Sequence, residues 1–405
     1  TQSRSSAASD VYKRQVMNMP KSVWWLVIGM ALNITGSSFL WPLNTIYMNE
    51  ELDKSLTMAG LVLMINSFGM VIGNLLGGNL FDKLGGYRTI MIGTVICLSS
   101  TTLLNFFHGW PWYAVWLVCL GFGGGMIVPA IYALAGAIWP QGGRQTFNAI
   151  YLAQNLGVAI GAASGGFVAE LSFNYIFIAN LLMYIAFGVV AISQFNIKLD
   201  VKVKSNDAMS LLDKAYRPQF IALTLLCVMF SICWIAYIQW ESTIASFTQE
   251  LNISMSQYSL LWTVNGIMIL VAQPLIIPII RLLKGNLKHQ MYVGIGIFII
   301  SFFVTSFAEQ FSVFMVGMII LTLGEMFVWP AVPTIANQLA PNGKEGSFQG
   351  YVNSAATVGK AFGPLIGGVV VDMFNMQIMF LSMISLLVLS LIFLTFYDHK
   401  LPKDI

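Results

Sequence analysis

Three ionisable side chains, Glu241, Glu325 and Lys360, lie inside long apolar stretches of the sequence. An ionised group in apolar surroundings is costly, so such residues are rare unless they pair with one another or exchange protons. A carboxyl group in this setting can take up and release a proton, and a lysine can neutralise a carboxylate. The chemistry that these residues predict is therefore proton exchange and charge pairing.

Glu325 lies near the middle of the apolar run 311–339. Because burial disfavours the ionised carboxyl group, we predict that Glu325 carries a proton or provides the counter-charge for a cationic ligand. The alternative is a packed structural acid, satisfied by hydroxyl groups or by a lysine. Glu241 lies in the outer third of the run 218–248, where it could bind ligand or protons, or extend its polar end to the outer water.

Lys360 and Glu325 lie at matching depths. Each is about fourteen residues, or ~21 Å of helix, into an apolar run, and the two runs have opposite directions. We therefore predict an ion pair between Glu325 and Lys360 whose formation and loss accompany protonation. The alternative is a static pair that only neutralises two buried charges.

Other reactive side chains do not gather in the sequence. The four cysteines fall inside apolar runs without metal-type spacing, and the three histidines lie at the ends of runs, so they predict neither disulfides nor a metal centre. An integral membrane enzyme would need such residues clustered at the membrane surface. We expect no enzyme activity, no cofactor and no metal.

The composition shows which elements must position these residues. Of 405 residues, 57% are hydrophobic and 9% are charged, whereas soluble domains have about 25% charged residues. The apolar stretches recur along the whole chain and reach the ~20 residues that span a bilayer as a helix. The chain is thus an all-α polytopic membrane protein, which excludes a secreted disulfide scaffold, a nucleic-acid binder and a cytosolic enzyme.

Twelve membrane-spanning helices are predicted. They cover residues 22–48, 56–81, 88–108, 112–139, 144–170, 174–195, 218–248, 256–284, 289–308, 311–339, 346–373 and 376–397. We expect a disordered N-terminal tail (1–21, of which 1–16 match nothing that follows and need not be native), an N-terminal six-helix bundle (22–195), a cytoplasmic linker (196–217), a C-terminal six-helix bundle (218–397) and a cytoplasmic tail (398–405).

The distribution of basic residues predicts the orientation. With a cytoplasmic N-terminus, every lysine and arginine lies on the cytoplasmic side except Lys54, outside, and Lys360, within a helix. Cytoplasmic loops are enriched in these residues, so both termini are expected in the cytoplasm.

The two halves contain an internal repeat. The segment from Gly124 to Gly166 is echoed by the segment from Gly324 to Gly368, with Pro129 matching Pro330. The repeat keeps its order and its direction across the membrane. Parallel halves of this kind place a substrate path at their interface, with alternating access by rocking.

A loop motif completes this pattern. The segment Gly77–Arg88 reads GGNLFDKLGGYR, and with the repeat and the twelve helices it resembles the major facilitator superfamily. The resemblance implies that Asp82 caps or pairs with a neighbouring helix end and latches the cytoplasmic side; the alternative is a charged loop that only sets topology. The motif residues are Gly78, Asp82, Lys83, Gly85 and Arg88.

Glycines in two of the helices form a second motif. It resembles the antiporter signature of the same superfamily and implies close helix packing; its residues are Gly157, Gly161, Gly165, Gly359, Gly363, Pro364 and Gly367. Three further segments, Tyr151–Gly165, Ile238–Ser242 and Thr322–Pro330, resemble the secondary multidrug transporters of lactic acid bacteria. Unlike many drug–proton antiporters, the chain has no charge in the membrane core of its N-terminal half.

Polar and aromatic residues in the helices are candidates for a cavity lining or for helix packing, and the sequence does not separate the two roles. The cavity candidates are Asn33, Asn44, Tyr132, Gln154, Asn155, Gln239 and Trp240. Other aromatic residues, including Tyr237, Trp262 and Trp329, could form a wall for flat lipophilic cations.

The resemblance implies a secondary transporter that exports lipophilic or cationic compounds in exchange for protons. It would act as a monomer in the plasma membrane, with a small-molecule substrate and without ATP or nucleic acid. The alternatives are an exporter or uniporter of an unidentified metabolite and a non-transporting membrane receptor or scaffold.

Overall fold

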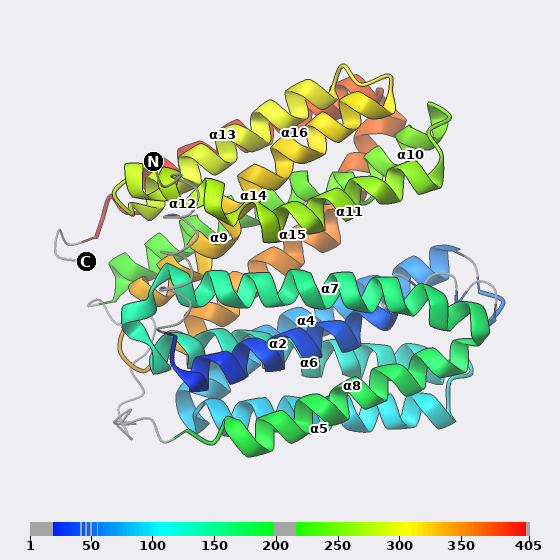
Figure 1. Ribbon diagram of the computed structural model, residues 1–405, viewed down its shortest axis with the longest axis vertical. Coiled ribbons are helices and arrows are strands. Elements are labelled where there is room, and N and C mark those ends of the chain that lie inside the picture. The colour runs from blue at the N-terminus through cyan, green and yellow to red at the C-terminus, as the bar shows by residue number, and fades with distance from the viewer. Residues whose placement is uncertain are drawn as a thin grey trace, which may run out of the picture. The chain divides into compact units, whose positions relative to one another are not determined.

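The computed structural model is all-helical in the parts of the chain that it describes, residues 19–40, 43–44, 47–48, 51–54, 56–197 and 216–401 (Figure 1). Helices satisfy every backbone hydrogen bond within one segment, which apolar surroundings require. Most of the predicted N-terminal tail and linker, and the end of the C-terminal tail, lie outside the described residues.

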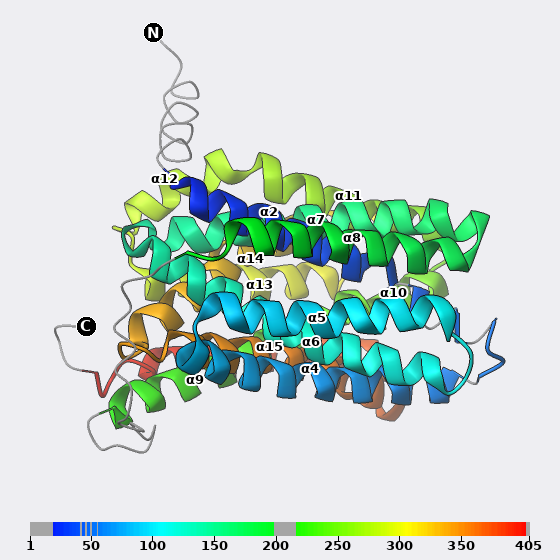
Figure 2. The ribbon, with the colours of Figure 1, turned by 90° about the horizontal axis from the view of Figure 1, so that it is seen from below.

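The chain divides into two compact units, and the first contains residues Pro20–Ala208 and Ala340–Ser354. Within it α2 packs on α7 and α8, α4 packs along α6, and α5 packs on α6 and α8 (Figure 1). Figure 2 shows α4, α5 and α6 side by side. Its helices are α2 (Lys21–Leu40), α4 (Leu56–Leu84), α5 (Gly86–Phe106), α6 (Trp112–Ile138), the short 3-10 turn η2 (Pro140–Gly142), α7 (Arg144–Leu171) and α8 (Phe173–Gln194).

The second unit contains residues Met209–Leu339 and Ala355–Ile405. The helix α15 (Glu345–Met373) therefore begins in the first unit and continues in the second. The other helices are α9 (Arg217–Tyr237), the 3-10 turn η3 (Ile238–Trp240), α10 (Thr243–Glu250), α11 (Met255–Val271), α12 (Gln273–Leu282), α13 (Leu287–Thr305), α14 (Phe311–Leu339) and α16 (Met376–Phe396).

The packing of helices repeats from one unit to the other. In the second unit α9 packs on α16, α11 packs on α14, and α13 packs on α14 and α16. In chain order, α9, α11, α13, α14 and α16 correspond to α2, α4, α5, α6 and α8. Each of these contacts therefore repeats a contact of the first unit. The parallel six-helix repeat predicted from the sequence is thus confirmed in the helix packing.

Most helix bounds agree with the sequence prediction, and two long runs are interrupted. The run 256–284 is broken between α11 and α12, which are bent by 58°. Pro274, in the first turn of α12, lacks the N–H that would bond to a carbonyl of α11 and its ring crowds that carbonyl. The run 218–248 passes through η3 between α9 and α10.

Ten helices of the described chain are long and apolar enough to span a membrane, and the bent pair α11–α12 adds an eleventh. The helix α7, with 28 residues, completes the set of twelve.

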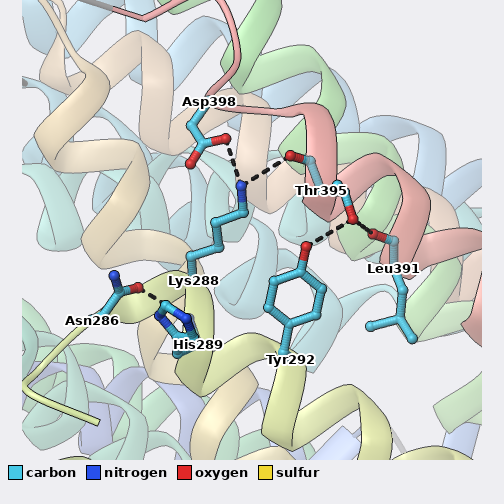
Figure 3. A network of polar contacts seen from close by, with 7 residues as sticks. All are labelled: Asn286, Lys288, His289, Tyr292, Leu391, Thr395 and Asp398. Carbon is cyan, nitrogen blue, oxygen red and sulfur yellow. Dashed lines mark hydrogen bonds and ion pairs between the residues drawn. The ribbon is translucent and has the colours of Figure 1, made fainter. Parts of the chain in front are cut away.

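Polar contacts join the ends of α13 and α16 within the second unit (Figure 3). Lys288 Nζ lies 2.6 Å from the carboxylate of Asp398 and donates to the carbonyl of Thr395 at 2.9 Å. Tyr292 shares a hydrogen bond of 2.7 Å with the Thr395 hydroxyl. A lysine near the last carbonyls of a helix is favourable because it complements the helix dipole, so these contacts stabilise the end of α16.

Glycines bring the backbones of α4, α5 and α6 together. A Cβ atom at Gly123 would lie 2.7 Å from the Cys97 sulfur in α5. A Cβ atom at Gly125 would lie 3.1 Å from the backbone nitrogen of Asn74 in α4 and would overlap the carbonyl oxygen of Met70. A Cβ atom at the intervening Gly124 would meet nothing within 4 Å. The glycine run of α6 is therefore a packing surface on two sides with an open side between them.

We expect Gly125→Ala to lower the free energy of unfolding by about 1–3 kcal/mol, because the added methyl group overpacks the α4–α6 contact. The neighbouring Gly124→Ala is the matched control and should be neutral or slightly stabilising, since alanine is the better helix former. Thermal unfolding of both variants in detergent measures the difference, and equal losses would contradict the assignment of the packing surface.

Candidate functional site

The carboxyl group of Glu325 is buried inside the second unit, with 1% of the residue exposed. It lies in α14, and its Oε1 accepts a hydrogen bond of 2.8 Å from the side-chain amide of Asn265 in α11. The same amide nitrogen donates to the Thr322 hydroxyl at 2.9 Å. A buried carboxyl group of a membrane helix is thus held by an amide from a neighbouring helix.

Lys360 takes a different partner from the one predicted. Its Nζ lies 3.9 Å from the centre of the Trp234 ring in α9, and the carboxylate with which it interacts electrostatically is that of Glu241. The expected ion pair with Glu325 is therefore wrong. Counting residues along a helix gives the depth of a side chain but not the face on which it lies, and Glu325 faces α11 whereas Lys360 faces α9.

Lys360 and Glu241 are both more exposed than Glu325. Lys360 is exposed although it lies near the middle of α15, and Glu241, just after η3, is half-buried. The contact of Lys360 with an aromatic ring rather than with an acid leaves its ammonium group stabilised by the ring electrons. Lys360 and Glu241 are therefore less enclosed by the protein than Glu325.

Trp329 is the centre of an aromatic cluster in the second unit. Its ring stacks on that of Trp234, with centroids 4.6 Å apart and planes inclined by 7°. Tyr237, Phe230 and Phe298 surround it at 5.4, 5.5 and 5.4 Å. One face of the Trp234 ring is therefore covered by Trp329 and the other by the ammonium group of Lys360, and its indole nitrogen is buried with no hydrogen-bond partner among the described residues.

Asp82, near the end of α4, caps the N-terminus of α15 within the first unit. Its two carboxylate oxygens accept hydrogen bonds from the backbone nitrogens of Gly346 at 2.8 Å and Ser347 at 3.0 Å, and from the Ser347 hydroxyl. These backbone groups have no partner within the helix, and a carboxylate there also complements the helix dipole. The carboxylate thus fixes the first turn of α15 to α4.

The rest of the loop motif surrounds this cap. Gly78 lets α4 approach closely, since a Cβ atom there would lie 3.1 Å from the Ser347 Cα and would overlap the carbonyl oxygen of Gly346. Gly85 has a φ of 84° and precedes the first residue of α5, a conformation that favours glycine. Lys83 and Arg88 are exposed.

The glycine motifs of α7 and α15 lie against α2 and α9. A Cβ atom at Gly157 would lie 2.8 Å from the carbonyl oxygen of Ala31, and one at Gly359 would lie 2.6 Å from that of Ser231. Contacts shorter than 3 Å would also form at Gly161, Gly363 and Gly367, whereas a Cβ atom at Gly165 would lie 3.3 Å from the carbonyl oxygen of Phe39. Pro364, beside them in α15, is exposed.

Most of the polar cavity candidates contact neighbouring helices. Gln239 is fully buried and donates to the carbonyl of Gly363 at 2.8 Å. Trp240 is also fully buried, and Asn44 is buried and accepts from the Tyr113 hydroxyl at 2.7 Å. These contacts connect helices within one unit.

The remaining candidates lie in the first unit. Tyr132 donates to Gln154 at 2.8 Å, and Asn155 donates to its own helix at Tyr151. Asn33 is buried, and its side-chain oxygen has no hydrogen-bond partner in the described part of the chain. The Asn33 side-chain oxygen therefore has unused hydrogen-bonding capacity.

Sequence reasoning missed Trp234 and the partner roles of Asn265 and Ser347. Trp234 precedes Glu241 by seven residues, a spacing that would put both on one face of an uninterrupted α-helix, but η3 interrupts the helix between them. Asn265 and Ser347 come from helices distant in sequence, and no spacing rule connects them to Glu325 or Asp82.

The electrostatic interaction between Lys360 and Glu241 predicts which substitutions are coupled. We expect Lys360→Met and Glu241→Gln to show a coupling free energy of about 0.5–1.5 kcal/mol in thermal unfolding, because each removes one partner of the same interaction. Lys360→Met with Glu325→Gln is the control and should be additive within about 0.5 kcal/mol. Coupling of Lys360 to Glu325 instead of Glu241 would contradict the pairing.

The whole chain is similar to known transporters. The profile of the Major Facilitator Superfamily matches residues 26–247 and 225–404. The uncharacterized MFS-type transporter YttB of Bacillus subtilis is 52% identical over 390 residues, covering 95% of this chain and 97% of the relative. The multidrug resistance protein MdtH of Escherichia coli is 21% identical over 367 residues, covering 89% and 88%.

Solved structures share the fold. The human organic anion transporter MFSD10 (TETRAN) superposes with a TM-score of 0.77 at 16% identity, covering 93% of this chain and 99% of that chain. The POT family transporter PepTSo gives 0.68 at 15% identity, covering 94% and 98%. The family profile matches both halves of the chain, and one relative is identical at more than half of the aligned residues. The chain therefore belongs to the Major Facilitator Superfamily and is a transporter rather than an enzyme.

Proposed function

We propose that this transporter exports lipophilic aromatic cations in exchange for protons, by alternating access. One observation in α14 carries the proposal: the buried carboxyl group of Glu325 lies one helical turn before Trp329, the centre of the aromatic cluster. Residues four apart share a face of a helix. A single helix therefore combines a group that can exchange a proton with a surface that can bind an aromatic ligand.

The hydrogen bond from Asn265 suits a proton-exchanging role for Glu325. An amide N–H donates to a carboxyl oxygen whether the carboxyl group is neutral or ionised, so this contact survives both protonation states. Ionisation at this depth is costly unless a positive charge approaches. A cationic ligand and a proton would thus compete for Glu325, which is the requirement for exchange.

The aromatic cluster and Glu241 supply the surface for a ligand. Flat apolar rings bind by stacking on indole and phenol rings, and a cation gains further attraction over a ring face. The cluster surrounds Trp329 with four aromatic side chains of α9 and α13. Glu241 adds a half-buried carboxylate that interacts electrostatically with Lys360.

The relatives agree with export of such compounds in part. MdtH is named for multidrug resistance and resembles the chain over most of its length. MFSD10 is named for organic anions, which carry the opposite charge, and at 16% identity its likeness concerns the fold. An exporter or uniporter of an unidentified metabolite is the second candidate, favoured by the absence of charge in the membrane core of the first six helices.

The orientation and location are part of the same proposal. The distribution of the basic residues favours an orientation with both termini in the cytoplasm, and we propose that the protein lies in the plasma membrane. On this orientation the contact of Asp82 with α15 lies on the cytoplasmic side, where we propose that it acts as a latch that must open during each transport cycle. Each chain would act as a monomer, because one chain supplies both repeats.

Transport by purified protein in liposomes tests the proton exchange. With an imposed pH gradient, we expect the wild type to move fluorescent lipophilic cations and Glu325→Gln to lose gradient-driven movement, because a glutamine cannot exchange a proton. Glu309→Gln, at an exposed position between α13 and α14, is the matched control and should transport normally. If no cation of the panel moves, the multidrug proposal is wrong and the metabolite candidate takes its place.

Hydrogen exchange tests the cap that the latch requires. Removing the carboxylate in Asp82→Ala leaves the first amides of α15 without their acceptor, at a cost of about 0.5–2 kcal/mol. We therefore expect the amides of Gly346 and Ser347 to exchange about 2- to 30-fold faster, together with altered transport. Lys83→Ala, the exposed neighbour, is the control. Unchanged exchange in Asp82→Ala would remove the basis for the latch.

A further inference from the structure

The Trp234 ring of the aromatic cluster already holds a cation, and that cation belongs to the protein. The ammonium group of Lys360 lies 3.9 Å from the ring centre, well within the ~6 Å limit for this interaction. The opposite face of the same ring is stacked on Trp329. The face under Lys360 is therefore the one on which a ligand could extend the stack.

From this arrangement we infer that Lys360 is a tethered occupant of the substrate site, and that a flat monocationic ligand binds by displacing its ammonium group from the Trp234 ring. The inference rests on the proposed function, because it takes aromatic cations as the substrate class. It assigns a specificity role to Lys360: the side chain competes with every cation for the ring face.

Displacement needs a place for the released ammonium group. Glu241 supplies it, since its carboxylate interacts electrostatically with Lys360 while the ammonium group rests on the ring. A lysine has a flexible four-carbon stem, so the head group can move toward Glu241 without movement of α15. The ligand then takes the ring face, and the displaced charge is neutralised by the carboxylate.

The displacement also requires that Lys360 is not enclosed by packing. The side chain is exposed although it lies near the middle of a membrane-length helix, so it is not locked by packing on all sides. The ring cluster behind it is almost entirely buried, with 8% of Trp329 and 7% of Tyr237 exposed. The ammonium group is therefore more exposed than the rings behind it.

The opposite interpretation is a site for aromatic anions. Lys360 and the unpartnered indole N–H of Trp234 would both donate to a carboxylate, and the rings would hold its apolar part. The two interpretations predict opposite effects of removing the lysine charge, so one experiment separates them.

Equilibrium binding to the purified full-length protein in detergent, without any gradient, tests the inference. The probes are ethidium, a planar monocation, acridine at pH 7.5, a planar and largely uncharged ring system, and 2-naphthoate, an aromatic carboxylate. Lys360→Met keeps the length of the side chain and removes its charge. We expect it to tighten ethidium binding by about 2- to 30-fold, the range of one cation–π contact, with a smaller gain for acridine.

Lys360→Arg is the second variant, because a guanidinium group binds ring faces at least as well as an ammonium group. Lys360→Arg should leave ethidium affinity unchanged or weaken it. This variant keeps the inference testable if Lys360→Met folds poorly. Unchanged or weaker ethidium binding by folded Lys360→Met overturns the inference. Binding of 2-naphthoate by the wild type that is lost in Lys360→Met overturns it as well. Binding that behaves as expected without gradient-driven transport would reject the proposed proton exchange alone.

Discussion

A charged side chain inside a membrane has to find its partner within the protein, because lipid offers none. This constraint explains the arrangement of the described ionisable groups along the helices. Within the helices, the Glu325 carboxyl group accepts a hydrogen bond from an amide and the Lys360 ammonium group lies over the face of an indole ring. Near the end of α4, the Asp82 carboxylate accepts hydrogen bonds from the free amides of a helix end. In each case the partner comes from another helix, so each charge fixes a relationship between two helices as well as its own position.

Glycine makes those relationships possible, because backbones that touch can bring short side chains into contact. Gly359 lies against Trp234, where a Cβ atom would be 2.6 Å from the Cβ of the tryptophan. Lys360 follows Gly359 directly, so the close approach of α15 to α9 is what puts its ammonium group over the Trp234 ring. Gly78 does the same for Asp82 by letting α4 reach the first turn of α15.

The sequence was sufficient to predict the helices, but not to predict which side chains of different helices contact one another. Hydropathy predicted most helix bounds, since the energetic cost of exposed backbone in lipid is a local property. The repeat and the loop motif predicted the family and gave Asp82 a helix end as its partner. The pairing of Lys360 failed because depth along a helix is encoded locally, whereas the face that a residue presents to a distant helix depends on how the whole bundle packs.

The repeat also shows what is specific to the second unit. The same frame occurs twice, with Gly157 against α2 and Gly359 against α9. At matching places the first unit has Val158 where the second has Lys360, and Gly124 where the second has Glu325.

The aromatic position differs in the same way. The residue of α2 that lies against Gly157 is Ile34, whereas the residue of α9 that lies against Gly359 is Trp234. Two units with one scaffold therefore differ in the residues that bind charge and rings. If both repeats served only to pack and move, their matching positions would be equally apolar. The lysine, the acid and the indole all lie on one repeat, whereas both repeats share the same helix packing. Under the proposed function, the second unit would therefore bind both the proton and the ligand.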